Sequence, residues 1–171
     1  MKIPSFLIAD FKSNHAGETG AVFIYKAARI FAISSKTRNI ANSHLLTEQE
    51  HLKIINNLIN KSNISKLIFL WKIFGFLLGF IGSIFGHKFF CLTIYAVESF
   101  VKDHYQQQID KLSNKKQYQD LRNLIIKIQS EEIEHMEDGI NNGYKKNLFS
   151  NIWIKIIYQG SKSAVNIAKK I

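Results

Sequence analysis

The sequence predicts an all-α protein: a four-helix bundle with a metal site inside it, a hydrophobic segment beside it and an extra helix at the C-terminal end. Three observations lead to this prediction. Pro4 is the only proline, so no proline interrupts a long helix further along the chain. Apolar residues recur at spacings of three and four along several stretches, which is the period of a helix with one buried face. The pattern Glu-x-x-His occurs twice, and a lone glutamate precedes each copy on another helical stretch.

The first two helices are expected at about 15–33 and 38–61, where the apolar period is clear. Ser62, Asn63 and Ser65 then break the pattern, and these residue types commonly cap the start of a following helix. A chain of 171 residues is long enough to bury a core, and we expect one domain over 1–171.

Residues 67–97 form an unusually apolar segment whose only formal charges are Lys72 and Lys88. Its uncharged run, 73–86, is too short and too interrupted by glycine for a spanning helix, which needs about 20 apolar residues. We therefore expect the segment to lie in a membrane interface or to cover a pocket as a hydrophobic lid. Trp71 and the nearby lysines are expected to anchor it at the level of the lipid headgroups.

Glycines recur through this segment at spacings of four, three and four: Gly75, Gly79, Gly82 and Gly86. On a helix they would line one face and leave bulky apolar side chains on the others. A stripe of small residues permits a neighbouring helix to approach closely. The stripe predicts a packing seam, within the monomer or an oligomer, or contact with a membrane, and the two can coexist.

Three further helices complete the expected fold. Residues 90–112 form the third metal-bearing helix, and 117–141 form the fourth, which ends at Gly139 or at 141–143. A last amphipathic helix at about 150–170 is expected to pack on the bundle or on the membrane.

The formal net charge of +10 favours anionic partners, which means nucleic acid or anionic membrane surfaces. The sequence has no nucleic-acid-binding signature, so we expect a membrane surface and no nucleic acid. Cys91 is the only cysteine; it excludes an intrachain disulfide, fits a reducing compartment and is expected to be a small core residue. Residues 1–10 are too short for a secretory signal, so the simplest expectation is a bacterial protein on the cytoplasmic side of the cell membrane. A mature organelle protein is the alternative.

Both Glu-x-x-His pairs can direct two side chains at one metal ion, because residues three apart are neighbours on a helix face. The pairs and the lone glutamates fall in phase with apolar stripes; the candidate ligands are Glu18, Glu48, His51, Glu98, Glu132 and His135. A buried carboxylate needs a partner, and four carboxylates with two imidazoles suit iron or manganese better than a metal that prefers thiolates. One such pair alone would more often be solvated helix surface, but the repeated order of ligands favours a metal site.

Five stretches carry a family resemblance: Asn14-His15-Ala16-Gly17-Glu18, Glu48-Gln49-Glu50-His51, Ala96-Val97-Glu98, His104-Tyr105-Gln106-Gln107-Gln108 and Glu131-Glu132-Ile133-Glu134-His135. Together they resemble the Coq7 family, the demethoxyubiquinone hydroxylases of ubiquinone biosynthesis, which have a ferritin-like di-iron bundle. The resemblance covers nearly the whole chain. Asn14 stands where the family usually has aspartate, and Thr19 stands where an aromatic residue is common. No ligand is changed.

The resemblance implies that two irons are held by the six candidate ligands named above, with a glutamate of each Glu-x-x-His pair as a bridge. It implies a role in substrate binding or electron transfer for His104 and Tyr105, for which core packing is the alternative. Asp103, Glu50 and Asp138 are the acids that could orient a metal-bound imidazole. NADH is the expected reductant. It is not expected to bind tightly, because the sequence has no dinucleotide-binding fingerprint, and reduction through the bound quinone is favoured instead.

The function that the resemblance implies is an O2-dependent 3-demethoxyubiquinol 3-hydroxylase, a monooxygenase that acts on a polyprenylated quinol held in the membrane. A homo-oligomer, or a complex with other ubiquinone-biosynthesis proteins, is possible on the same grounds. The alternative is a ferritin-like protein that oxidises iron or scavenges peroxide, but such a protein has no need of the apolar segment at 67–97. A third possibility is a membrane-associated helical protein without catalysis, which the intact ligand set disfavours.

Overall fold

A computed structural model describes residues 1–142 and 147–171, and its regular elements are all helical. The described part of the chain contains six α-helices, which confirms the predicted all-α class: α1 (Ile8–Phe31), α2 (Ser35–Leu58), α3 (Ile68–Ile84), α4 (His87–Leu112), α5 (Gln119–Asn141) and α6 (Leu148–Lys170). Short 3-10 turns lie at Ser5–Leu7, Lys61–Asn63 and Lys116–Tyr118.

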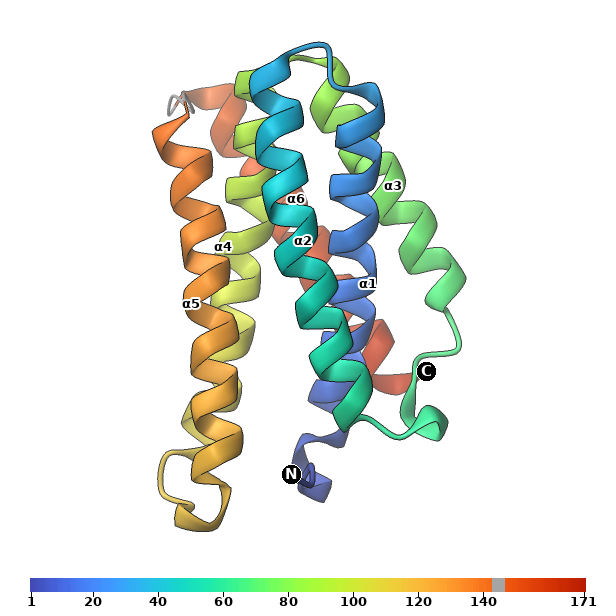
Figure 1. Ribbon diagram of the computed structural model, residues 1–171, viewed down its shortest axis with the longest axis vertical. Coiled ribbons are helices and arrows are strands. Elements are labelled where there is room, and N and C mark those ends of the chain that lie inside the picture. The colour runs from blue at the N-terminus through green and yellow to red at the C-terminus, as the bar shows by residue number, and fades with distance from the viewer. Residues whose placement is uncertain (143–146) are drawn as a thin grey trace.

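Helices α1, α2, α4 and α5 form the four-helix bundle (Figure 1). Helix α3 packs along the outer side of α1 and returns the chain to the other end of the bundle, so that α2 and α4 run in the same direction. A bundle with one long crossover is the connectivity of ferritin-like folds. Helix α6 packs across α1 and α4 on the face away from α2.

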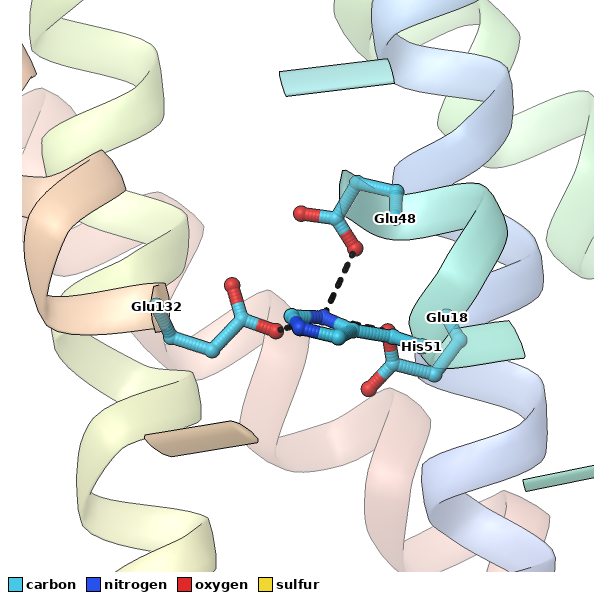
Figure 2. A group of neighbouring side chains, drawn as sticks. All are labelled: Glu18, Glu48, His51 and Glu132. Atoms are coloured by element: carbon cyan, nitrogen blue, oxygen red, sulfur yellow. Dashed lines mark hydrogen bonds and ion pairs between the residues drawn. The ribbon is translucent and has the colours of Figure 1, made fainter. Parts of the chain in front are cut away.

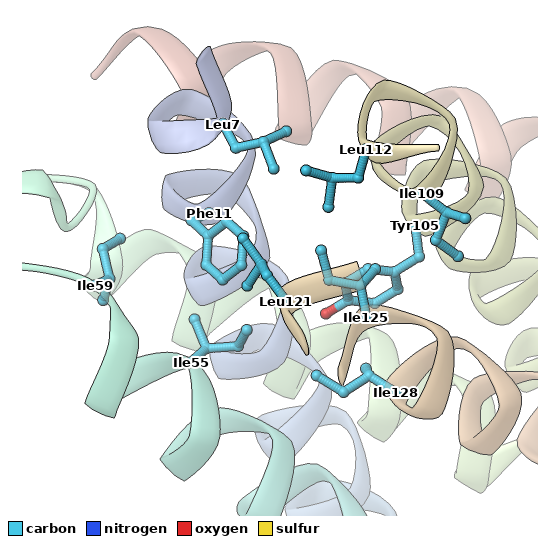
Figure 3. Close-up of a cluster of buried hydrophobic side chains, with 10 residues drawn as sticks. All are labelled: Leu7, Phe11, Ile55, Ile59, Tyr105, Ile109, Leu112, Leu121, Ile125 and Ile128. Carbon is cyan, nitrogen blue, oxygen red and sulfur yellow. The ribbon is translucent and has the colours of Figure 1, made fainter. Parts of the chain in front are cut away.

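Helix α1 begins at Ile8, seven residues before the predicted start at 15. The reason is packing that the local pattern did not show. Leu7 and Phe11 are fully buried in an apolar cluster to which all four bundle helices contribute (Figure 3). The limits of α2, α4, α5 and α6 lie within three residues of the predicted ones.

Two apolar clusters lie on either side of the bundle's middle. The first contains Leu7, Phe11, Ile55, Ile59, Tyr105, Ile109, Leu112, Leu121, Ile125 and Ile128 (Figure 3). The second contains Val22, Tyr25, Ala28, Ala41, Leu45, Phe90 and Ile94. The predicted ligands occupy the layer between these clusters, so burial on both sides removes them from water.

Two glycines of the stripe, Gly75 and Gly79, form a packing seam between α3 and α1, whereas Gly82 faces α4. An ideal Cβ on Gly75 would lie 2.9 Å from the carbonyl carbon of Gly20, and one on Gly79 would lie 2.7 Å from that of Ile24. Real Cβ atoms do not approach backbone so closely, so the seam requires glycine at both positions. Gly86 does not belong to this stripe, because it lies after α3 with a φ of 94° and separates α3 from α4.

The outer face of α3 is apolar and exposed, with Phe69 72% and Phe74 58% accessible. Trp71 was expected at headgroup level, and that expectation is wrong: the residue is 8% exposed, and its indole N–H donates to Ser65 Oγ at 3.1 Å. No helix among the described residues is both long enough and apolar enough to cross a membrane.

Helix α6 packs on the bundle, which was one of the two predicted alternatives, the other being a membrane. Trp153 Nε1 donates to Thr93 Oγ1 at 3.1 Å, and Lys169 Nζ contacts Asp10 Oδ1 at 2.7 Å. Phe149 and Ile156 of this helix nevertheless remain largely exposed.

Cys91 and Gly139 meet in the contact between α4 and α5. Cys91 is a fully buried free cysteine, as predicted. Helix α5 ends at Asn141, and Gly139 lies inside it against the carbonyl oxygen of Cys91. Of the alternative end at 141–143, Gly143 lies outside the described residues.

Candidate metal centre

The bundle brings the six predicted ligands together in one buried layer, and none is more than 5% exposed. They form two overlapping groups whose ligand atoms lie within 4.8 Å of one another: Glu18, Glu48, His51 and Glu132 in one, and Glu48, Glu98, Glu132 and His135 in the other. Glu48 and Glu132 belong to both groups. These two carboxylates therefore occupy the positions from which a side chain could bridge two metal ions.

The two imidazoles face the shared carboxylates with the same nitrogen. His51 Nδ1 lies 3.1 Å from Glu132 Oε1 and 3.6 Å from Glu18 Oε2, between helices α1, α2 and α5 (Figure 2). His135 Nδ1 lies 3.2 Å from Glu48 Oε1 and 3.3 Å from Glu132 Oε2. The two Glu-x-x-His pairs thus face each other across the bundle, each with Nδ1 directed inward.

The electrostatics of this layer show an uncompensated excess of acid. Burial raises the pKa of Glu48 well above its ordinary value, and the nearby carboxylates of Glu132 and Glu18 add to the shift. Burial and Glu132 likewise raise the pKa of Glu98 to about 8. The site therefore favours protons or other cations among its carboxylates.

The two imidazoles have the opposite effect on the pKa of Glu132. Burial alone would raise the pKa of Glu132, but the neighbouring imidazoles of His135 and His51 lower it to about 2. Burial alone would lower the pKa of His51, but Glu132 and Glu18 raise it to about 12. Positive charge on the two imidazole rings thus offsets part of the negative charge of the glutamates. Metal ions bound among the same side chains would offset more of it.

The donor atoms fit a metal ion. Five buried polar atoms of the ligand set lack a hydrogen-bond partner among the described residues: Glu18 Oε2, Glu48 Oε1, Glu48 Oε2, Glu132 Oε2 and His135 Nδ1. Buried polar atoms are rarely left without a partner, because the lost solvation is costly. These atoms point to a buried Glu/His group that is able to hold a metal.

The predicted ligands are themselves held by neighbouring side chains. Glu131 Oε2 lies 2.7 Å from His51 Nε2, the nitrogen that faces away from the carboxylates. Two tyrosine hydroxyls donate to the lone glutamates: Tyr25 to Glu98 Oε1 at 2.9 Å, and Tyr105 to Glu18 Oε1. A carboxylate that accepts from a ligand imidazole fixes the ring and its tautomer.

None of the three acids suggested for this orienting role contacts a predicted histidine ligand. Glu50 is exposed and pairs with Lys53, and Asp103 accepts from the Tyr158 hydroxyl. Asp138 contacts His44 and not a predicted ligand. Glu131, which does contact His51, was not singled out, although its position next to Glu132 was visible in the sequence.

His104 and Tyr105 lie at different distances from the site. Tyr105 is fully buried and contacts Glu18 through its hydroxyl. His104 contacts no predicted ligand; its Nε2 lies 2.9 Å from Asn14 Oδ1 and 3.1 Å from Ser13 Oγ. Burial lowers the pKa of His104 to about 4, so the ring is neutral near pH 7.

A largely apolar cavity of about 500 Å³ extends from the ligand layer toward α3 and α6. Glu18, Glu48, Glu98 and Glu132 lie at its inner end, and His104 and Tyr105 are part of its wall. On the other side it is lined by side chains of α3 and α6, including Phe74, Leu78, Ile156 and Ile157. The sequence suggested a lid over a pocket, and here α3 and α6 together form the outer wall.

Comparison with known proteins agrees with this geometry. The model of the family described as ubiquinone biosynthesis protein COQ7 matches residues 7–168. The 3-demethoxyubiquinol 3-hydroxylase of Rhodospirillum rubrum is 28% identical over 98% of this chain and 80% of its own length. The mitochondrial NADPH-dependent 3-demethoxyubiquinone 3-hydroxylases of Caenorhabditis elegans and Dictyostelium discoideum are 27% and 26% identical, each over 92% of this chain, and over 87% and 74% of their own lengths. The chain belongs to the COQ7 family of ubiquinone biosynthesis proteins.

Proposed function

We propose that this protein is an O2-dependent 3-demethoxyubiquinol 3-hydroxylase. The observation that carries the proposal is the cavity, which joins a layer of four buried glutamates to the apolar outer helices. A hydrophobic ring substrate needs a passage of this kind, and the names of the relatives supply its identity. The reaction places one oxygen atom of O2 on the quinol ring and releases the other as water.

The six ligands would hold two iron ions. Glu18 and His51 would bind one ion and Glu98 and His135 the other, with the shared Glu48 and Glu132 between them. Iron bound there supplies the activation of O2. The surrounding residues keep the site dry and hold the lone glutamates by their tyrosine hydrogen bonds, so that the ligands need little rearrangement.

His104 and Tyr105 would act at the substrate end of the site. Both line the cavity next to the ligand layer. The neutral imidazole of His104 is held by Asn14 and Ser13, with its Nε2–H donated to Asn14 Oδ1, so that its Nδ1 would accept from a quinol hydroxyl. Tyr105 would hold Glu18 and form the wall against which the ring lies.

The substrate would reach the cavity from a bilayer. Exposed apolar side chains lie on both helices that form the cavity's outer wall: Phe69 and Phe74 on α3 and Ile156 on α6, of which Phe74 and Ile156 also line the cavity. Together with the net charge of +10, this surface supports peripheral binding to the cytoplasmic side of an anionic bacterial membrane. A polyprenyl tail could then remain in lipid while the ring enters the bundle. On the membrane, the protein would associate with further copies of itself or with other ubiquinone-biosynthesis proteins.

The proposed reductant is a reduced nicotinamide nucleotide that binds weakly. We expected NADH, whereas the eukaryotic relatives are named as NADPH-dependent. Supplying each nucleotide separately in the hydroxylation assay decides which one serves this protein.

The first experiment measures iron per chain after anaerobic Fe(II) reconstitution. We expect about two irons in the wild type, and a large loss in the Glu48→Ala, Glu132→Ala double variant, because both shared carboxylates are removed. The matched control is the Glu50→Ala, Glu134→Ala double variant, which removes exposed carboxylates from the same two helices and should keep its iron.

The second experiment adds liposomes that contain a short-chain demethoxyubiquinol, O2 and reductant. Hydroxylated quinol, detected by mass spectrometry, supports the proposal. Iron binding with iron oxidation but no quinol product would support the ferritin-like alternative instead. Little iron in the wild type would refute the metal site itself.

A further inference from the structure

The two ligand histidines are supported in different ways. His51 has a carboxylate on its outer nitrogen, since Glu131 lies 2.7 Å from Nε2. No described residue makes the equivalent hydrogen bond to Nε2 of His135. Instead, the His135 ring is stacked against the ring of His44, with centroids 3.9 Å apart and planes inclined by 19°.

His44 is itself held in place from two sides. It is 2% exposed, and its Nε2–H donates to Asp138 Oδ2 at 2.9 Å. The ring of Tyr25 meets it edge-on with centroids 5.2 Å apart. Asp138 lies one turn beyond His135 on α5, with a side chain that is 50% exposed, and His44 lies one turn before Glu48 on α2.

These contacts close a small loop between the two helices of the paired ligands. Asp138 and His135 project from α5, and His44 projects from α2 into the space between them. Rotation of the His135 ring about its bond to Cβ would carry Nδ1 away from Glu48 and Glu132, which it approaches at 3.2 and 3.3 Å. A flat ring stacked on one face opposes that rotation.

We propose that His44, held by Asp138, is a positioning residue that sets the plane of the His135 imidazole and thereby the geometry of one of the two metal ions. The proposal rests on the proposed metal centre. It assigns to a stacked ring the task that Glu131 performs for His51 by a hydrogen bond. It also makes the two halves of the site unequal, because the Glu98–His135 half depends on ring stacking and the Glu18–His51 half on a hydrogen bond.

The test uses Co(II), whose visible absorption depends on the arrangement of its ligands. The full chain is titrated anaerobically with Co(II) as wild type and as His44→Ala, His44→Leu and His44→Phe. In the Ala and Leu variants, loss of the stacked ring should lower the affinity for one of the two Co(II) ions about 10-fold or more. It should also change the absorption bands of that ion. His44→Phe restores a flat ring without the hydrogen bond and should keep both ions and most of the spectrum.

The Leu variant separates positioning from space filling, because leucine fills the site but is not flat. Unchanged Co(II) affinity and spectrum in His44→Leu would overturn the proposal, as would a Phe variant that behaves like Ala. Glu131→Ala provides the comparison for the other half of the site. It should lower the affinity for the other Co(II) ion and leave unchanged the absorption bands that the His44 variants alter.

Asp138→Ala covers the case in which the His44 variants do not fold, since Asp138 is half-exposed and its removal leaves the core filled. Thermal melting of the metal-free proteins identifies that case. Asp138→Ala should shift the same absorption bands as His44→Ala by a smaller amount, and unchanged bands would overturn the proposal. A wild-type chain that binds no Co(II) would refute the proposed metal centre together with this inference, whereas normal wild-type binding with unaffected variants would refute this inference alone.

Discussion

Replacing Gly79 with alanine should force α1 and α3 apart. An ideal Cβ on Gly79 would lie 2.7 Å from both the carbonyl carbon and Cα of Ile24, and closer still to its carbonyl oxygen. Carbon atoms in good contact lie about 3.5–4.0 Å apart, so the helices would have to separate locally by roughly 0.8 Å or more. All of the obstructing atoms are backbone, so no side chain can rotate to make room.

The expected cost follows from these contacts. Overpacking typically costs about 1–3 kcal/mol, and rigid backbone on both sides places this substitution near the upper end. Alanine is better than glycine within a helix by about 1 kcal/mol, which leaves a net destabilisation of about 2 kcal/mol. Gly160→Ala is the matched control, because an added Cβ there meets nothing within 4 Å. That variant should gain about 1 kcal/mol from helix propensity alone.

The assay is thermal unfolding of both variants beside the wild type, followed by circular dichroism. A difference of about 3 kcal/mol between the variants corresponds to about 6–12 °C in Tm for a chain of this size. Chemical denaturation of the same proteins should give the same order of stability. If Gly79→Ala melts at or above Gly160→Ala, the close approach of α1 and α3 is not as described and the reasoning fails.

Two further predictions concern buried acids outside the paired motifs. Asp10 accepts from Lys111 and Lys169 at 2.7 Å each; burial alone would raise the pKa of Asp10, but the two ammonium groups lower it below its ordinary value. Its stabilising effect is therefore present above about pH 4 and lost as pH falls through the folded-state pKa, so Asp10→Asn should cost about 1–3 kcal/mol in urea denaturation at pH 7 and much less near pH 3. An equal cost at both pH values would contradict this. Tyr105→Phe leaves Glu18 Oε1 without its hydroxyl donor and should cost about 1–3 kcal/mol in the metal-free protein. The cost should shrink when Mn(II) is added, as calorimetry would show, and a cost that Mn(II) does not change would argue against Glu18 as a ligand.

Most of the ligand layer could be predicted from the sequence because it depends on spacing within single helices. Glu132 and His135 continue the stripe of Leu121, Ile125 and Ile128, and all five are buried as expected. A period of 3.6 residues decides which side chains share a face whatever the neighbouring helices do. The same reasoning identified a seam at Gly75 and Gly79 but not the helix against which it packs.

The contacts between helices could not be predicted in this way. Trp71 has the residue type and the lysine neighbours of a headgroup anchor, yet it is buried and bonded to Ser65. Glu131 contacts His51 from the opposite side of the bundle, and Asp138, suggested as an orienting acid, contacts His44. The sequence indicated the helical stretch to which each of these residues belongs, but not the residue of another segment that it contacts.

By itself, the sequence determined the helical class, the inward faces and the six residues that meet in the buried layer, since each of these follows from local periodicity. Only the tertiary structure decided the early start of α1, the cavity between the ligand layer and the outer helices, and the stack of His44 on His135. These features depend on the rotation and axial offset of one helix against another. Side-chain packing summed over the whole core sets those two quantities, and no single stretch of the chain contains them.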